Sequence, residues 1–156
     1  MSVERIFLVC SWFISGILLL LFVPKKKIPQ AIIILLFAQT LSWISGILLV
    51  MFDLVRFPVR EFSSATNVSF SRHFVVYPTI FVLFALYYPI DWKKWAQGSF
   101  IVLFASMMTM YAYFTMKYTS LIEMENGVMY LLFMVFVIHL YSSIRFFLWF
   151  QKGMKT

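Results

Sequence analysis

The chain has 156 residues, of which 63% are hydrophobic and 12% are charged. A soluble domain is typically about half apolar and about a quarter charged, and so short a chain cannot bury this much apolar surface in a water-soluble core. The composition therefore excludes an ordinary soluble domain and indicates a membrane protein. The net charge of +7 does not indicate nucleic acid, because the basic residues lie between apolar segments and form no separate basic patch.

Five apolar segments follow one another along the chain. They cover residues 6–23, 31–52, 74–90, 99–116 and 128–148. A spanning helix needs roughly 20 apolar residues, with about 17 as the lower limit. The runs are continuous and do not alternate, which favours helices over the strands of a barrel. We therefore predict an all-α fold, in which residues 1–156 form a single domain of five transmembrane helices.

Lys and Arg are unequally divided between the two ends of this predicted bundle. Eight of them, facing the single acid Asp91, lie in two short loops and at the C-terminal end: Lys25, Lys26, Lys27, Lys93, Lys94, Arg145, Lys152 and Lys155. Five others share the opposite side with five acids: Arg5, Arg56, Arg60, Arg72 and Lys117. Because cytoplasmic loops carry the excess of Lys and Arg, we expect the N-terminus outside and the C-terminus in the cytoplasm.

Two neighbouring segments contain nearly the same phrase, SWFISGILLLLF from residue 11 and SWISGILLVMF from residue 42. Small residues in these segments fall about one helical turn apart: Ser11, Ser15, Ala38, Ser42 and Gly46. Small side chains let helices approach closely in lipid, so we interpret them as packing residues. The alternative is an intramembrane hydrolase with Ser15 or Ser45 as nucleophile. We disfavour it because neither serine lies in a G-x-S-G context.

Several polar residues lie within the apolar segments. His139 is near the middle of the fifth, where an ionisable group indicates either a proton-linked or ligand-binding site or a neutral histidine that hydrogen-bonds another helix. Gln39 in the second segment has the same two interpretations, a ligand or proton site or an amide that links two helices, and we favour the amide. Ser106, Thr109 and Tyr113 form a polar stripe on the fourth. Such stripes either line a narrow cavity or hydrogen-bond neighbouring helices.

The connection over residues 53–73 is the longest, and it mixes charged with aromatic residues. This pattern is typical of a segment lying on the membrane surface. It contains three candidates for binding lipid headgroups or anions: Arg56, Arg60 and Arg72. The alternative is that the arginine side chains extend to the interface and pair with Asp53 and Glu61.

The sequence contains one cysteine, Cys10, which excludes an internal disulfide and a multi-cysteine metal site. Too few apolar residues precede Cys10 for a signal peptide, so we expect no cleaved leader. We expect neither a metal nor a cofactor.

Three short motifs carry a family resemblance. FPVRE at residues 57–61, VVYP at residues 75–78 and YYP at residues 87–89 lie within the stretch 24–89. In this stretch the chain resembles a family of small multi-pass membrane proteins from endospore-forming Gram-positive bacteria. The resemblance implies a bacterial inner-membrane location, and it implies no activity or catalytic residue.

These observations favour a non-enzymatic membrane component that acts through helix–helix association or lipid contact. The expected partners are membrane lipids and a second copy of the chain or another membrane protein, with no nucleic acid. The second hypothesis is a small transporter or permease subunit with a polar site around His139. An intramembrane hydrolase is the third.

Overall fold

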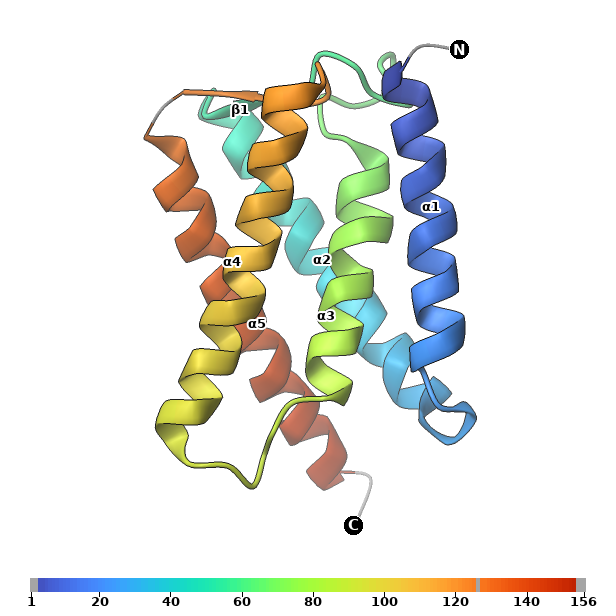
Figure 1. The fold of residues 1–156 in the computed structure, drawn as a ribbon, viewed down its shortest axis with the longest axis vertical. Coiled ribbons are helices and arrows are strands. Elements are labelled where there is room, and N and C mark those ends of the chain that lie inside the picture. The colour runs from blue at the N-terminus through green and yellow to red at the C-terminus, as the bar shows by residue number, and fades with distance from the viewer. Residues whose placement is uncertain (1–2, 126, 154–156) are drawn as a thin grey trace.

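A computed structural model describes residues 3–125 and 127–153. The described chain is all-α, as predicted, apart from one two-stranded ribbon (Figure 1). The helices are α1 (Val3–Phe22), α2 (Ile28–Met51) after a 3₁₀ turn η1 (Lys25–Lys27), α3 (Tyr77–Leu86) after a π-helical segment η2 (Ser71–Val76), α4 (Lys94–Tyr118) and α5 (Val128–Gly153).

Four of the helices, α1, α2, α4 and α5, are long and apolar enough to cross a membrane. The chain is therefore a multi-pass helical membrane protein. The helix formed by η2 and α3 is shorter, with 6 and 10 residues respectively. At about 1.5 Å per residue it extends roughly 24 Å, less than a hydrocarbon core of about 30 Å.

The short helix is shifted from the predicted third segment, residues 74–90. It begins earlier, so that Arg72 and His73 belong to the helix and not to the preceding loop. It also ends earlier, at Leu86. The early end has a local cause, because Pro89 disfavours the helical conformation of the residue before it and has no N–H to donate.

Helix α3 lies at the centre of the bundle. It packs against α2 and α5 and also touches α1, while α4 packs chiefly against α5. Figure 1 shows α3 between α4 and α1, with α2 behind it. Most α3 side chains are buried, among them Phe81, Val82 and Phe84. The apolar core is therefore built around α3, which is shorter than the four helices long enough to cross a membrane.

A short antiparallel ribbon closes one end of the bundle. Strand β1 (Val55–Arg56) pairs with β2 (Glu123–Met124), with Val55 opposite Met124. The ribbon joins the connection after α2 to the connection before α5. Val55 and Phe57 are buried beneath it, so part of the connection predicted to lie on the membrane surface packs on the bundle itself.

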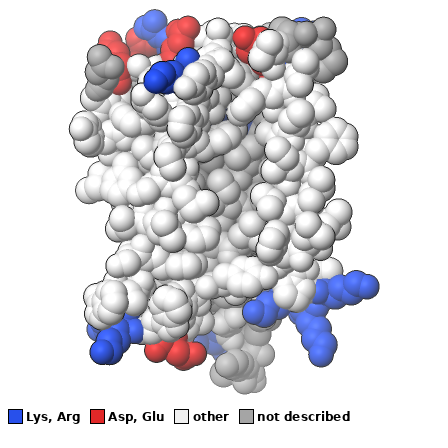
Figure 2. All heavy atoms as spheres, viewed as in Figure 1, with Lys and Arg blue, Asp and Glu red and all other residues white. Residues whose placement is uncertain are grey.

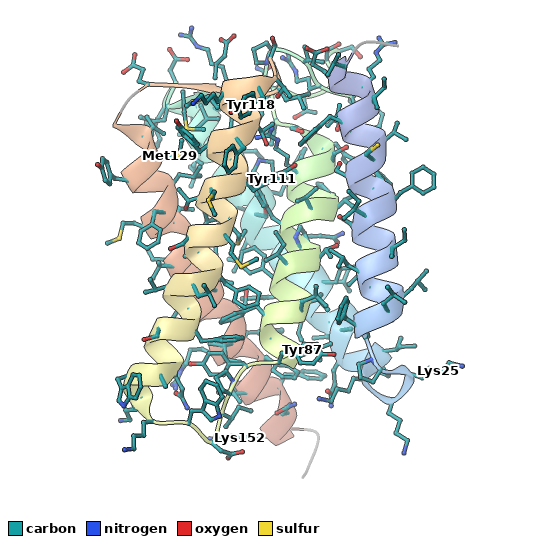
Figure 3. All side chains as sticks on the ribbon, viewed as in Figure 1. Lys25, Tyr87, Tyr111, Tyr118, Met129 and Lys152 are labelled. Atoms are coloured by element: carbon teal, nitrogen blue, oxygen red, sulfur yellow. The ribbon has the colours of Figure 1, made fainter. Side chains whose placement is uncertain are left out.

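Charged side chains gather at the two ends of the molecule and leave its middle apolar (Figure 2). Lys25 and Lys152 lie at the end opposite the ribbon, whereas Tyr118 and Met129 lie at the ribbon end (Figure 3). Acidic and basic groups mix at the ribbon end. Lys155, counted above with the basic end, is outside the described residues.

Candidate functional site

The Glu61 side chain caps the start of the helix formed by η2 and α3. Both carboxylate oxygens of Glu61 accept hydrogen bonds, one from the N–H of Phe70 and one from the N–H of Ser71, each at 3.1 Å. These N–H groups have no partner inside a helix, so the carboxylate acts as a cap. The π-helical segment η2 follows directly, and such segments are frequent at functional sites.

Helix α2 holds η2 in place from the opposite side. The Gln39 side-chain nitrogen donates a hydrogen bond of 2.9 Å to the Phe74 carbonyl oxygen. The Gln39 amide therefore links two helices, as interpreted from the sequence. The Trp43 ring contacts the Phe74 ring edge-on at 4.8 Å between centroids. These contacts fix the rotation of η2 and thereby direct the two preceding side chains, Arg72 and His73, into the bundle.

Arg72 is a buried cation near the ribbon end of the bundle, with 1% of its surface exposed. Its guanidinium carbon lies 5.7 Å from the centroid of the Phe57 ring and 5.8 Å from that of Tyr111. Within residues 3–125 and 127–153, none of its three guanidinium nitrogens has a hydrogen-bond partner. Aromatic faces attract a cation, but they do not replace the hydrogen bonds that it loses on leaving water.

His73, the next residue, packs tightly against α2. Its Nδ1 lies 2.9 Å from the Ser42 hydroxyl oxygen. Gly46, one turn further along α2, leaves space for the imidazole, because a Cβ atom at Gly46 would lie only 2.7 Å from Cε1 of the ring. The other ring nitrogen, Nε2, is buried and has no partner among the described residues. The ring thus has one hydrogen-bonding position unused.

His73 and His139 line the same small cavity. The cavity has a volume of about 20 Å³, and its wall also includes Ser45, Tyr77 and Phe136. A volume of this size holds about one water molecule. His139 is buried and contacts the Phe81 ring at 6.0 Å between centroids, and the structure shows no hydrogen bond from its side chain to a described residue. The histidine that hydrogen-bonds another helix is therefore His73.

The Ser42–His73 pair has the separation of a serine nucleophile and its base, yet it has no space for a substrate. Ser42 is 2% exposed, and the adjoining cavity is of water size. Acyl transfer also needs donors aimed at the developing oxyanion, close to the attacking oxygen. The pair is suited to orienting the imidazole, not to attacking a carbonyl group. Ser15 and Ser45 are likewise not paired with a histidine.

The polar stripe of the fourth helix lies apart from these residues. Ser106 and Tyr113 are exposed on the outer face of α4, and the Thr109 hydroxyl donates to the carbonyl oxygen of Ala105 at 2.8 Å. The face of α4 that enters the bundle consists of other residues: Ile101, Ala105, Met108, Ala112 and Thr115. The structure does not bring the stripe together with His139.

The three arginines proposed for lipid or anion binding occupy different environments. Arg56 is exposed and bonded to Asp53 through two guanidinium nitrogens, at 2.8 and 2.5 Å. The hydrogen bond from Arg56 lowers the pKa of the Asp53 carboxyl below its usual value. Arg60 donates to the carbonyl oxygens of Thr66 and Phe57, which orders the loop. Arg72 alone is directed into the bundle.

The small residues of the repeated phrase have different neighbours on the two helices. Ala38, Ser42 and Gly46 form a buried stripe on α2. On α1, Ser15 is buried, Ser11 is partly exposed and bonds its own helix at 2.6 Å, and Gly16 is open, with nothing near its Cβ position. The α2 stripe therefore receives η2, while α1 packs against η2 and α3.

The residue that sequence reasoning missed is His73. The predicted connection over residues 53–73 includes His73, whereas the structure places it in a helix and, with His139, against one cavity. The small residues Ser42 and Gly46 indicated that another helix packs closely against α2. They did not identify the His73 ring as the group that makes this contact.

Comparisons of the chain with protein-family models, curated proteins and solved structures give no match. The fold and the composition establish that the chain is a multi-pass helical membrane protein.

Proposed function

We propose that the chain is a non-enzymatic membrane component that acts through helix–helix association or lipid contact. It belongs to the cell membrane, with the N-terminus outside and the C-terminus in the cytoplasm. The unequal charge of the two ends supports this orientation. The motifs at residues 57–61, 75–78 and 87–89 support a bacterial inner membrane.

The observation that carries the proposal is the exposure of α1. Only 11% of its apolar span is buried inside the chain, against 39% for α5. A groove of about 610 Å³ runs along α1 past Trp12, Phe13 and Gly16. An exposed glycine permits close approach of a second helix, and a groove of this kind also accepts an acyl chain. A membrane partner or lipid is therefore the expected occupant.

The single native cysteine provides a direct test of association. Cys10 is exposed on α1. If α1 packs against a second copy or another protein, a short bismaleimide added to native membranes should give a larger covalent adduct. Cys10→Ser should abolish the adduct, and Phe13→Cys and Ile17→Cys in the Cys10→Ser background should restore it. If no position gives an adduct, α1 is not an association surface.

A transporter subunit is the second candidate, and the cavity between His73 and His139 favours it. The outward position of Ser106 and Tyr113 means that one chain alone does not enclose a polar path, so this function requires a second copy. It predicts that His139→Ala leaves folding intact and abolishes a proton-linked flux in reconstituted vesicles. Unchanged flux in this variant would exclude His139 from the mechanism.

A further inference from the structure

The guanidinium of Arg72 has no ion-pair or hydrogen-bond partner among the described residues. The Asp53–Arg56 pair is the one ion pair among the residues that the structure describes. Glu61, on the neighbouring loop, uses both carboxylate oxygens for the N–H groups that begin η2. A buried charge without a partner is strongly unfavourable. This favours a compensating group from outside the described residues.

The surroundings of Arg72 favour an anion as this group. The guanidinium presents a planar fork of N–H donors, which matches the paired oxygens of a phosphate or carboxylate. The rings of Phe57 and Tyr111 on either side limit access of water, which strengthens an ionic contact.

Helices α1 and α4 make little contact with each other beside Arg72. Helix α1 packs against η2 and α3, and α4 packs chiefly against α5, so neither long helix is held mainly by the other. Near Arg72 they meet through stacked rings, Phe7 on α1 and Tyr111 on α4, whose centroids are 6.2 Å apart. Tyr111 lies on α4 toward the ribbon end (Figure 3). A ligand that reaches the guanidinium between these helices would displace this ring pair.

We propose that Arg72 binds an anionic phosphate or carboxylate group that enters between α1 and α4 by displacing the Phe7–Tyr111 ring pair. A lipid headgroup and a small soluble anion share this chemistry. The proposal rests on the lipid-contact part of the proposed function and is tested independently of association through α1.

The test measures thermal unfolding of the full chain in phosphatidylcholine nanodiscs. Three anions are added separately: phosphatidylglycerol in the bilayer, inorganic phosphate and acetate in the buffer. The wild-type melting temperature should rise with at least one of them, because a ligand that binds only the folded state stabilises it. A rise with phosphatidylglycerol alone identifies a lipid headgroup. A rise with phosphate or acetate identifies a soluble anion.

Three variants show whether Arg72 is responsible. Arg72→Met should remove the response and, without anion, should melt above the wild type, because it removes an unpaired buried charge. Arg72→Lys keeps the charge but loses the fork, so it should need about tenfold more anion for the same shift. Arg56→Gln, which changes an exposed arginine, should respond as the wild type does.

Two results would overturn the proposal. One is a wild-type melting temperature that none of the three anions raises. The other is an equal response of the wild type and Arg72→Lys to every anion concentration, which would show that the guanidinium fork does not hold the anion. Neither result depends on the folding of Arg72→Met, and neither bears on cross-linking at Cys10.

Discussion

Gly46 makes possible the tightest contact in the buried polar region, because it has no side chain. The imidazole of His73 occupies the space where a Cβ atom would lie, within 2.7 Å of that position. The same ring is held through Ser42 at 2.9 Å. Gly46 and the Ser42 hydroxyl therefore fix the position of His73, which lies far from them in the sequence, after a long connection.

Gly46→Ala should displace the His73 ring and lower the free energy of unfolding by about 1–3 kcal/mol, as overpacking typically does. Gly16→Ala is the matched control, because nothing lies within 4 Å of the added methyl group on α1. It should leave stability unchanged or raise it by up to about 1 kcal/mol through helix propensity. Thermal unfolding in nanodiscs compares the two. Equal effects would show that the His73 contact is absent in the membrane.

Asp53 predicts a dependence of stability on pH. Its φ of 57° lies in the left-handed region, and Arg56 lowers the pKa of its carboxyl by hydrogen bonding. A carboxyl with a lowered folded-state pKa stabilises the fold above its unfolded pKa of about 3.9, and this contribution is lost as pH falls through the folded value. Asn also tolerates left-handed φ, so Asp53→Asn should keep the turn.

The measurement is the change in melting temperature between about pH 6 and about pH 3. The wild type should lose more stability over this interval than Asp53→Asn. Both side chains of the pair are well exposed, so the difference should be small and should shrink at high salt. A larger loss in Asp53→Asn would contradict the stabilising role of the pair.

At the scale of elements, continuous apolar runs were sufficient to predict the all-α fold and its long helices. They were not sufficient to locate the start of the third helix. The predicted third segment begins at residue 74 and leaves Arg72 in the loop, because a charged residue is costly within a membrane span. The helix includes it because Glu61, several residues upstream, caps the N–H groups of Phe70 and Ser71. Such a contact across a loop leaves no periodic pattern in the sequence.

The capping role of Glu61 has a direct test. Glu61→Ala should lower the free energy of unfolding by about 1–2 kcal/mol, the usual effect of losing a helix cap, and should speed amide exchange at the start of η2. Glu125→Ala, at an exposed acid in the connection before α5, should change neither. Unchanged exchange in Glu61→Ala would mean that η2 begins without this cap.

The sequence pattern also did not predict which face of α4 points into the bundle. A polar stripe normally faces the interior of a membrane bundle. In this chain Ala105 and Ala112 face inward instead, with Met108 between them, because small side chains allow α4 to approach α5 closely. Ser106 and Tyr113 are left on the outer face. Polarity favoured an inward position for Ser106 and Tyr113, whereas close packing favoured Ala105 and Ala112. Packing determined the orientation of α4.

At the scale of the whole molecule, the charge difference between the two ends predicts the orientation in the membrane. Ser64 and Lys26 are exposed in connections at opposite ends. In the Cys10→Ser background, a membrane-impermeant maleimide added to intact cells should label Ser64→Cys, at the outer end, but not Lys26→Cys. Labelling of both should follow lysis. The opposite pattern in intact cells would reverse the orientation.

The most direct test of the proposed function is the composition of the protein extracted with its native lipid. Affinity purification from native membranes in a lipid-preserving polymer, followed by mass spectrometry, reports bound proteins, bound lipids and the number of copies. If the chain acts through association or lipid contact, it should carry a stoichiometric second copy, another membrane protein or an enriched lipid. A strictly monomeric chain, free of partners and surrounded by lipid of bulk composition, would contradict the account.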